Sequence, residues 1–385
     1  MGNSGLFMPH SWNYLLLWVS PLTFYINWIH ALNLGLASFF FALFMRKQGV
    51  GWAAIAVGLL TAFWLGSNLT LTYAGHTVKF GVLMLASVAL YCISCALSRQ
   101  LSLRWAILAG GAIGLMFLEQ LDVALFFGFA LGSYALFLAI RQWQIHRAWK
   151  KMTLIFVVIG GVGLLFGATT MLSGYLSNVK GAVSMQTESP REKWEFVTQW
   201  SWPPEECIDF VAPGYMGWRS GEPEGPYWGR MGRSAGWEQS RQGFMNFKLE
   251  NTYVGIIPIL LACFAVLSAI VGWKRRSPGI RSGDQPAVGG TVELASEADE
   301  NSTRTLEIVF WGCVTGVTLL LAFGKFFPLY ALFYKLPLVS SIRNPNKFLQ
   351  VFQLALGILA AYGLDEMIRG KFGDCAERRH KKQQK

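Results

Sequence analysis

The fold is decided by residues Trp105–Ile140, which read WAILAGGAIGLMFL-EQLD-VALFFGFALGSYALFLAI. Two apolar runs, Trp105–Leu118 and Val123–Ile140, flank the four-residue turn Glu119-Gln120-Leu121-Asp122. A helix that crosses a bilayer needs about 20 largely apolar residues, so this stretch predicts two antiparallel membrane helices joined by a tight turn. Acidic side chains at that depth are costly unless they face a cavity or a partner. The turn is therefore a candidate site as well as a connection, although an ordinary exposed hairpin turn is the alternative.

The composition of the whole chain agrees with a membrane protein. Hydrophobic residues make up 53% of the 385 residues, charged residues only 14%, and the mean hydropathy is +0.37. A soluble domain usually carries about 25% charged residues. We therefore predict an all-α, polytopic membrane protein that lies in the lipid bilayer.

Apolar runs like those at Trp105–Ile140 recur along the chain and predict nine spans in all. The nine predicted spans are His30–Met45, Val50–Leu69, Phe80–Leu97, Trp105–Leu118, Val123–Ile140, Thr153–Leu172, Val254–Trp273, Leu306–Phe323 and Leu349–Ile368.

The connections divide the chain into four regions. Residues 1–172 are expected to form an N-terminal bundle of six spans, and residues 173–250 form a long extracytoplasmic loop. Residues 251–368 hold the last three spans, with a flexible linker at 276–304, and residues 369–385 form a basic cytoplasmic tail. Two aromatic segments, Trp12–Trp28 and Phe326–Tyr334, are expected at the membrane surface.

The positive charge predicts the orientation of the chain. Lys and Arg are concentrated in connections on one side of the predicted spans and in the tail, which is typical of cytoplasmic loops. This places the N-terminus outside and the C-terminus in the cytoplasm, and it explains the net charge of +11 without a nucleic-acid partner. The five basic groups are Arg46/Lys47, Arg99/Arg104, Arg141–Lys151, Lys274–Arg276 and Arg369–Lys385.

Familiar motifs of soluble enzymes are missing from the sequence. The six cysteines form no disulfide framework, because most of them lie in apolar runs, and the five histidines show no metal-ligand spacing. There is no HExxH, P-loop or GxSxG sequence. The polar residues that could support chemistry are instead in the long loop, in the segment 324–348 and in the short turns on the same side.

Several of these polar stretches resemble one family. In order, they are His30–Val50, Tyr73-Ala74-Gly75-His76-Thr77-Val78-Lys79, Trp200–Glu206 with Ala212–Tyr215, Asn251-Thr252-Tyr253-Val254-Gly255, and Leu336–Phe348 running into Ala360–Asp365. Together they cover nearly the whole chain, and they resemble the YfhO-type bacterial membrane proteins. That family is similar to the GT-C class of polyprenyl-phosphate-dependent glycosyltransferases.

The resemblance implies a glycosyltransferase in the bacterial cytoplasmic membrane. Such an enzyme takes a sugar from a polyprenyl-phosphate donor and transfers it to a cell-envelope glycan on the outer face. The chemistry needs a carboxylate that deprotonates or orients the acceptor, and cations for the phosphate leaving group. Among the matched motif residues, the resemblance implies substrate-binding roles for Asn344 and Tyr253. No cofactor is indicated by the residues, and a divalent metal ion stays an open alternative.

Four basic side chains are candidates for binding the phosphate. Arg343 and Lys347 are four residues apart and would share one face if the last helix begins early; they could then clamp a phosphate at the helix N-terminus. The alternative is that they anchor a span at the lipid headgroups. His76 and Lys79 could bind a phosphate or a sugar hydroxyl, or could simply be solvated at the interface.

Four acidic side chains are candidates for catalysis. Glu205 and Glu206 follow Pro203-Pro204 in the long loop, where an ordinary solvated helix start is the alternative. Glu119 and Asp122 lie in the tight turn. If the enzyme reading is right, we expect these acids, His76 and the Arg343/Lys347 segment to converge on one outer cavity.

The chain departs from the family at two places. It has Glu119-Gln120-Leu121-Asp122 where the family commonly shows a His-Pro-Gln turn. GT-C enzymes also carry an acidic motif in the first outer loop, after a first helix, and neither precedes His30 here. We therefore expect a fragment or a late start codon, in which case the family's acidic motif of the first outer loop lies outside this chain. Two other functions stay open, a transporter or flippase for a lipid-linked or anionic solute and a non-catalytic membrane scaffold.

Overall fold

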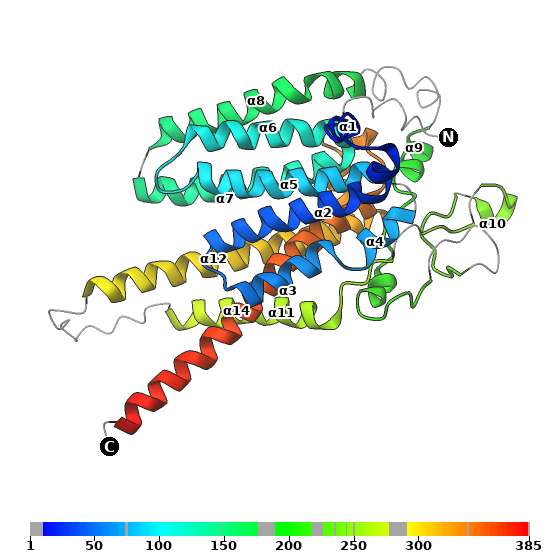
Figure 1. Ribbon diagram of the computed structural model, residues 1–385. Coiled ribbons are helices and arrows are strands. Elements are labelled where there is room, and N and C mark those ends of the chain that lie inside the picture. The colour runs from blue at the N-terminus through cyan, green and yellow to red at the C-terminus, as the bar shows by residue number, and fades with distance from the viewer. Residues whose placement is uncertain are drawn as a thin grey trace.

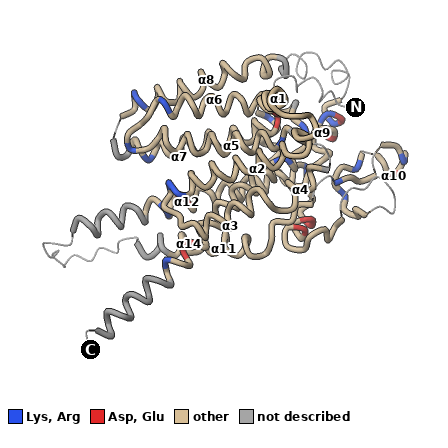
Figure 2. Tube along the Cα trace, in the orientation of Figure 1, with Lys and Arg blue, Asp and Glu red and all other residues tan. Residues whose placement is uncertain are grey.

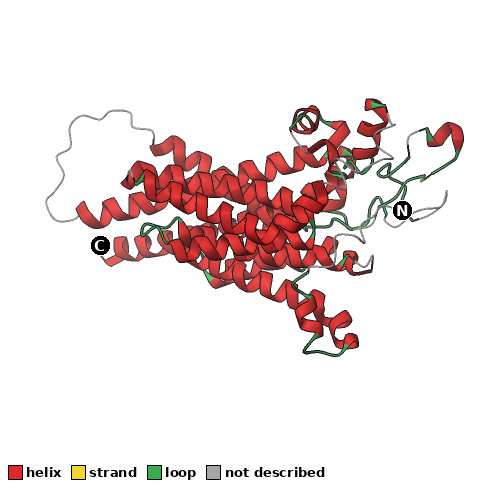
Figure 3. Cartoon of the chain, turned by 90° about the horizontal axis from the view of Figure 1, so that it is seen from above, coloured by secondary structure: helices red, strands yellow, loops and turns green. Residues whose placement is uncertain are grey.

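The computed structural model describes residues 11–73, 76–146, 148–175, 189–217, 226–234, 236–243, 245–248, 251–276, 291–336 and 339–383. In this part of the chain the regular structure is helical, and the one β-type pairing is an isolated bridge between Gly217 and Tyr227. The prediction of an all-α protein is confirmed. The helices run side by side, and most of the loop structure gathers at one end (Figure 3).

Ten helices build the body of the molecule (Figure 1). Six of them are long and apolar enough to cross a membrane, and a seventh span results if the bent pair α3 and α4 is counted as one. The ten are α2 (Leu22–Lys47), α3 (Trp52–Phe63), α4 (Gly66–Tyr73), α5 (Thr77–Ala96), α6 (Leu103–Glu119), α7 (Leu121–His146), α8 (Trp149–Tyr175), α11 (Ile256–Arg276), α12 (Thr291–Ala322) and α14 (Phe348–Gln383).

Short elements gather where the long loop and the connection to α14 lie, and we call this end of the bundle the loop end (Figure 1). They are α1 (Tyr14–Leu17), α9 (Pro190–Val197), the 3-10 turn η3 (Pro204–Phe210), α10 (Trp237–Ser240), η4 (Gly324–Phe326), α13 (Pro328–Tyr334), η5 (Val339–Ser341) and η6 (Pro345–Lys347).

Each predicted span coincides with a helix, but three expectations were wrong in part. The span predicted at Val50–Leu69 is bent by 44° between α3 and α4. Residues 291–304, expected in the flexible linker, are helical and belong to α12, while 277–290 lie outside the described residues. The segment Trp12–Trp28 was expected at the membrane surface, yet from Leu22 onward it is already part of α2.

The bend between α3 and α4 lies where the end of the long loop contacts Gly66. Gly66 has a positive φ of 23°, and a Cβ there would lie 2.6 Å from the carbonyl oxygen of Tyr253 and 2.7 Å from that of Asn251. The end of the long loop therefore passes directly over the break. The hydroxyl of Thr70 also accepts a hydrogen bond from the Asn251 amide at 3.0 Å. Only a glycine allows so close an approach of two backbones.

The last long helix, α14, lies at the centre of the bundle. In the most apolar 18-residue stretch of α14, 94% is buried inside the protein, whereas in the corresponding stretch of α8 only 22% is buried. α14 packs against α3, α11 and α12. Its contact with α3 is close because Gly58 and Gly357 face one another: a Cβ on Gly58 would meet the Gly357 oxygen at 2.7 Å. The N-terminal and C-terminal spans therefore share one core.

Figure 2 shows Lys and Arg at both ends of the bundle, and we call the end opposite the loop end, where α2 terminates in two basic residues, the basic end. Arg46 and Lys47 lie there in the last turn of α2. Asp365 of α14 fixes this end: it accepts hydrogen bonds from the Gly51 amide at 2.8 Å, from Arg304 of α12 at 2.5 Å and from Arg369 at 2.7 Å. One carboxylate thus joins α14 to α12 and to the start of α3.

Candidate functional site

Four of the predicted site residues come together at the loop end, and we call them the His76 cluster: His76, Lys79, Asp122 and Lys347. Lys347 precedes α14 and forms an ion pair with Asp122 in the first turn of α7. His76 precedes α5, and Lys79 lies in its first turn. The charges of Lys79 and Lys347 both act on Asp122 and on His76. Three segments far apart in the sequence therefore meet at one site.

The cluster is partly withdrawn from solvent. Lys79 is buried, and the Lys347 and Asp122 side chains are 13% and 26% exposed. Burial, together with the positive charges of Lys79 and Lys347, lowers the pKa of His76 to about 4, and Asp122 opposes this shift. At neutral pH the cluster thus holds two ammonium groups, one carboxylate and a neutral imidazole. The excess positive charge suits an anion.

An apolar groove lies along α7, and its lining residue Leu125 follows Asp122 by three residues. It has a volume of about 320 Å³ and lies between α5, α6, α7 and α8. Phe117 and Leu125 line its upper part, close in sequence to the turn that carries Asp122, and Gly128 and Gly132 widen it along α7. An apolar groove of this size fits a hydrocarbon chain, and a cationic cluster fits an anionic group.

Glu119 lies next to the cluster in sequence but faces another way. Its carboxylate accepts hydrogen bonds from Ser11 at 2.7 Å and Asn13 at 3.2 Å, and it packs over Gly81, where a Cβ would come within 2.7 Å. The segment before α1 therefore covers it. Its second oxygen has no hydrogen-bond partner among the described residues.

Arg343 and Asn344 contact the long loop instead of the cluster. The Arg343 guanidinium lies 3.8 Å from the centre of the Phe196 ring and donates to the Gln199 side chain at 2.7 Å. Asn344 has a positive φ of 74°, and α14 begins only at Phe348. The expectation that Arg343 and Lys347 share a helical face was wrong, because the chain turns between them.

Glu205 and Glu206 lie in η3, away from the His76 cluster's three segments, and have different surroundings. Glu205 is half-exposed and pairs with Arg230 at 2.5 Å; these hydrogen bonds lower the pKa of Glu205. Glu206 is fully buried. Its oxygens accept from Tyr227 at 2.6 Å and Lys248 at 3.1 Å, and Lys248 also pairs with the buried Asp209. The network of Glu206, Asp209, Tyr227 and Lys248 resembles the core of the loop more than a reaction centre.

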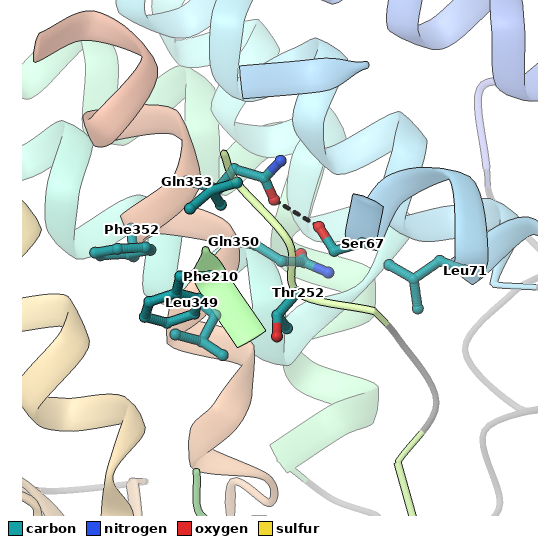
Figure 4. A pocket seen from close by; sticks show the side chains of 9 residues that line it. Ser67, Leu71, Phe210, Thr252, Leu349, Gln350, Phe352 and Gln353 are labelled. Atoms are coloured by element: carbon teal, nitrogen blue, oxygen red, sulfur yellow. Dashed lines mark hydrogen bonds between the residues drawn. The ribbon is translucent and has the colours of Figure 1, made fainter. Parts of the chain in front are cut away.

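Tyr253 lies at the break between α3 and α4, beside a second candidate site that the sequence did not predict. Its amide donates to the Asn251 side chain at 3.2 Å. The residue before it, Thr252, lines a small, mostly apolar cavity together with two glutamines of α14, Gln350 and Gln353 (Figure 4). In the sequence these two glutamines lie within an apolar run and were not predicted as site residues. Their spacing of three residues, which places both on one face of a helix, is the signal that could have indicated them.

Within the described residues there is no group of three or more His, Cys, Asp and Glu side chains that could hold a metal ion. Of the residues expected to converge on one outer cavity, His76, Asp122 and Lys347 lie together with Lys79. Glu119, Glu205, Glu206 and Arg343 contact other partners, so the full expected set does not converge.

Comparison of the chain with models of known protein families, with characterised proteins and with solved structures finds no match. The structure itself defines the class: the six apolar helices make the chain a polytopic, all-helical membrane protein. Its most distinctive feature is the His76 cluster at the loop end, and two of the helices that contribute to this cluster, α5 and α7, also line an apolar groove.

Proposed function

We propose that the chain is a GT-C-like glycosyltransferase of the YfhO type, which takes a sugar from a polyprenyl-phosphate donor. The observation that carries this proposal is the His76 cluster together with the groove along α7. A lipid phosphate would lie against Lys79 and Lys347, and its hydrocarbon tail would lie in the groove. Both halves of one amphiphile thus have complementary surfaces.

Asp122 is the carboxylate best placed to act on the acceptor. In the free protein it is paired with Lys347. A donor phosphate would compete for that ammonium group, because a phosphate offers it a second anionic partner. Asp122 would then be released to orient the acceptor hydroxyl or accept its proton. Glu205, Glu206 and Glu119 have other partners, so we assign catalysis to Asp122 among the four acids.

The proposed orientation is supported by the basic groups in the short connections between spans at the basic end. We propose that this end faces the cytoplasm of a bacterial cell, with the C-terminus inside, the N-terminus outside and nine spans between them. The loop end then faces the cell envelope, where a glycan acceptor would meet the donor. A donor already attached to lipid is appropriate there, since nucleotide sugars stay in the cytoplasm.

Binding of farnesyl phosphate, a short polyprenyl-phosphate probe, tests the proposal. The full chain in lipid nanodiscs would be titrated with it, and Lys347→Ala would be compared with Lys335→Ala, which removes an exposed lysine near the same end. We expect Lys347→Ala to weaken binding by about tenfold or more, because a charge-assisted contact is lost. Equal affinity of the two variants, or no binding by the unchanged chain, would refute the proposal.

The transporter alternative receives less support. It requires ionisable side chains near the middle of the membrane. Glu307 is a buried acid of α12, but it lies only five residues from the start of the membrane-length stretch Ser302–Ala322, near the basic end, and it pairs with Arg141 at 3.4 Å. The Glu307 carboxylate also accepts a hydrogen bond from the Tyr134 hydroxyl at 3.3 Å. This arrangement resembles a contact that holds α7 and α12 together.

A further inference from the structure

The cavity in Figure 4 is built by three parts of the chain. α4 contributes Ser67, the end of the long loop contributes Thr252, and the first turns of α14 contribute Gln350 and Gln353. Apolar side chains, Phe210 and Phe352 among them, close the remaining sides. The cavity has a volume of about 10 Å³, which is room for about one water-sized group.

Two of the polar side chains already have partners. Ser67 donates to the Gln353 side chain at 2.6 Å, and Gln353 donates to the Thr61 carbonyl oxygen at 3.0 Å. The other two do not. Gln350 is 7% exposed and Thr252 is 4% exposed, and among the described residues neither atom of the Gln350 amide nor the Thr252 hydroxyl has a hydrogen-bond partner. Buried polar groups are nearly always hydrogen-bonded.

The chemistry of these groups indicates what they bind. An amide offers one acceptor and one donor side, and a threonine hydroxyl both donates and accepts. A phosphate would use only the donors, and a cation only the acceptors. A hydroxyl group uses both, and a single hydroxyl oxygen fits the volume.

The cavity and the His76 cluster both use the start of α14. Gln350 is one helical turn from Lys347 along α14, and α4, which carries Ser67, leads through the next few residues to His76. In a glycosyl phosphate the sugar follows directly after the phosphate. A phosphate held at Lys347 would therefore bring the sugar to Gln350.

We propose that this cavity recognises one hydroxyl group of the donor sugar, with Gln350 and Thr252 as the specificity-determining residues. The inference rests on the proposed function. The cavity admits the hydroxyl oxygen while the sugar ring stays outside it. A donor sugar that lacks this hydroxyl, or carries it in the opposite configuration, would leave the buried amide without a partner. Hydrogen-bonding sites reject such analogues in this way.

Two short probes separate this inference from the function on which it rests. The full chain in nanodiscs would be titrated with farnesyl phosphate and with a panel of farnesyl phosphates that carry glucose, galactose, mannose or N-acetylglucosamine. We expect at least one glycosylated probe to bind about tenfold more tightly than the bare phosphate. Gln350→Leu should abolish this gain and leave the Kd of farnesyl phosphate unchanged.

Two substitutions at position 252 provide the matched control. Thr252→Val removes the hydroxyl and should reduce the gain, whereas Thr252→Ser keeps the hydroxyl and should preserve it. This pair also decides the matter if Gln350→Leu fails to fold. If farnesyl phosphate binds but no sugar adds affinity, or if the gain survives both Gln350→Leu and Thr252→Val, the cavity holds a water only and the inference is wrong. If farnesyl phosphate itself does not bind, the proposed function fails first.

Discussion

Lys248 shows how a single side chain can determine the interior of the long loop. Its ammonium group is fully buried, pairs with Glu206 and Asp209, and lies 4.5 Å from the centre of the Trp202 ring. Two buried carboxylates share one cation, and the remaining oxygens accept from Tyr227 and from the Met216 amide at 2.9 Å. Because the network is complete, the loss of the cation is expected to be costly.

We therefore expect Lys248→Met to destabilise the long loop by about 3–5 kcal/mol, since it leaves two buried carboxylates without their counter-charge. The control is Arg230→Ala, which removes one half of the half-exposed pair with Glu205 and should cost less than about 1 kcal/mol. Thermal unfolding and limited proteolysis of the full chain measure the difference. If both variants resist protease equally, the buried network contributes little.

His76 makes stability depend on pH. Its pKa is lowered to about 4 in the folded chain from an ordinary value of 6.5, so between these values the unfolded state binds the extra proton. Stability is therefore complete above about pH 6.5 and falls as the pH is lowered toward 4.

Between pH 7 and pH 5 we expect a loss on the order of 1 kcal/mol at this half-buried site, after allowance for solvent screening. The loss should be absent in His76→Gln. Unfolding temperatures of the two proteins at several pH values give the measurement, and parallel curves would contradict it.

Residue identity alone predicted part of the site. The His-x-x-Lys turn, the acidic turn and the basic segment before α14 were singled out by position, since polar residues between spans are conspicuous. The sequence did not predict which of these residues pair. It gave no indication that Lys347 pairs with Asp122 while Arg343 contacts Phe196. The partner of a buried charge depends on which segments meet, as the Glu206–Lys248 pair also shows.

At the scale of the elements, close helix packing depends on glycine. α3 and α14 approach at Gly58, where a Cβ would lie 2.7 Å from the Gly357 oxygen and 2.8 Å from the Ala361 Cβ. Small residues at such crossings are the usual means of helix association in membranes.

Gly58→Ala should accordingly destabilise the chain by about 1–3 kcal/mol through overpacking. Gly35→Ala in α2 is the matched control, because no atom lies within 4 Å of a Cβ at that position. It should leave stability unchanged or slightly raised, as alanine is the better helix former. Unfolding of both variants in the same detergent provides the comparison, and equal losses would show that the α3–α14 contact can relax.

The positions of the helices were the easiest feature to predict. An apolar segment in a membrane forms a helix because a helix satisfies the segment's own backbone hydrogen bonds. Two features were missed for a physical reason. The bend at Gly66 arises from a distant loop that passes over it. The helical part of 291–304 is polar in sequence, yet Arg304 is tied to Asp365 and Glu366 of α14. Both depend on contacts between segments far apart.

At the scale of the whole molecule, the proposed orientation can be measured directly. Single cysteines would be introduced at Ser240 in the long loop and at Gln100 in the exposed turn between α5 and α6, after replacement of the six native cysteines. With the basic end in the cytoplasm, a membrane-impermeant maleimide should label intact cells only at position 240. Labelling at position 100 instead would reverse the orientation and remove the proposed site from the cell envelope.

The overall architecture was predictable in class but not in arrangement. Composition and span length predict a helical membrane protein, and the structure confirms this. The sequence order suggested two bundles, 1–172 and 251–368, whereas α14 packs against α3 and against α11 and α12. Apolar runs of similar composition do not indicate which helix will be central, so the core could not be predicted.

The central place of α14 has a consequence for how the protein is made. α14 is the last long helix in the described chain to leave the ribosome, yet it is the one around which α3, α11 and α12 assemble, and Asp365 on it fixes the start of α3. Until synthesis reaches residue 348, the earlier helices lack the surface against which they pack. Nascent chains interrupted before that point would expose the Gly58 face of α3 to lipid, and membrane quality control could recognise that face.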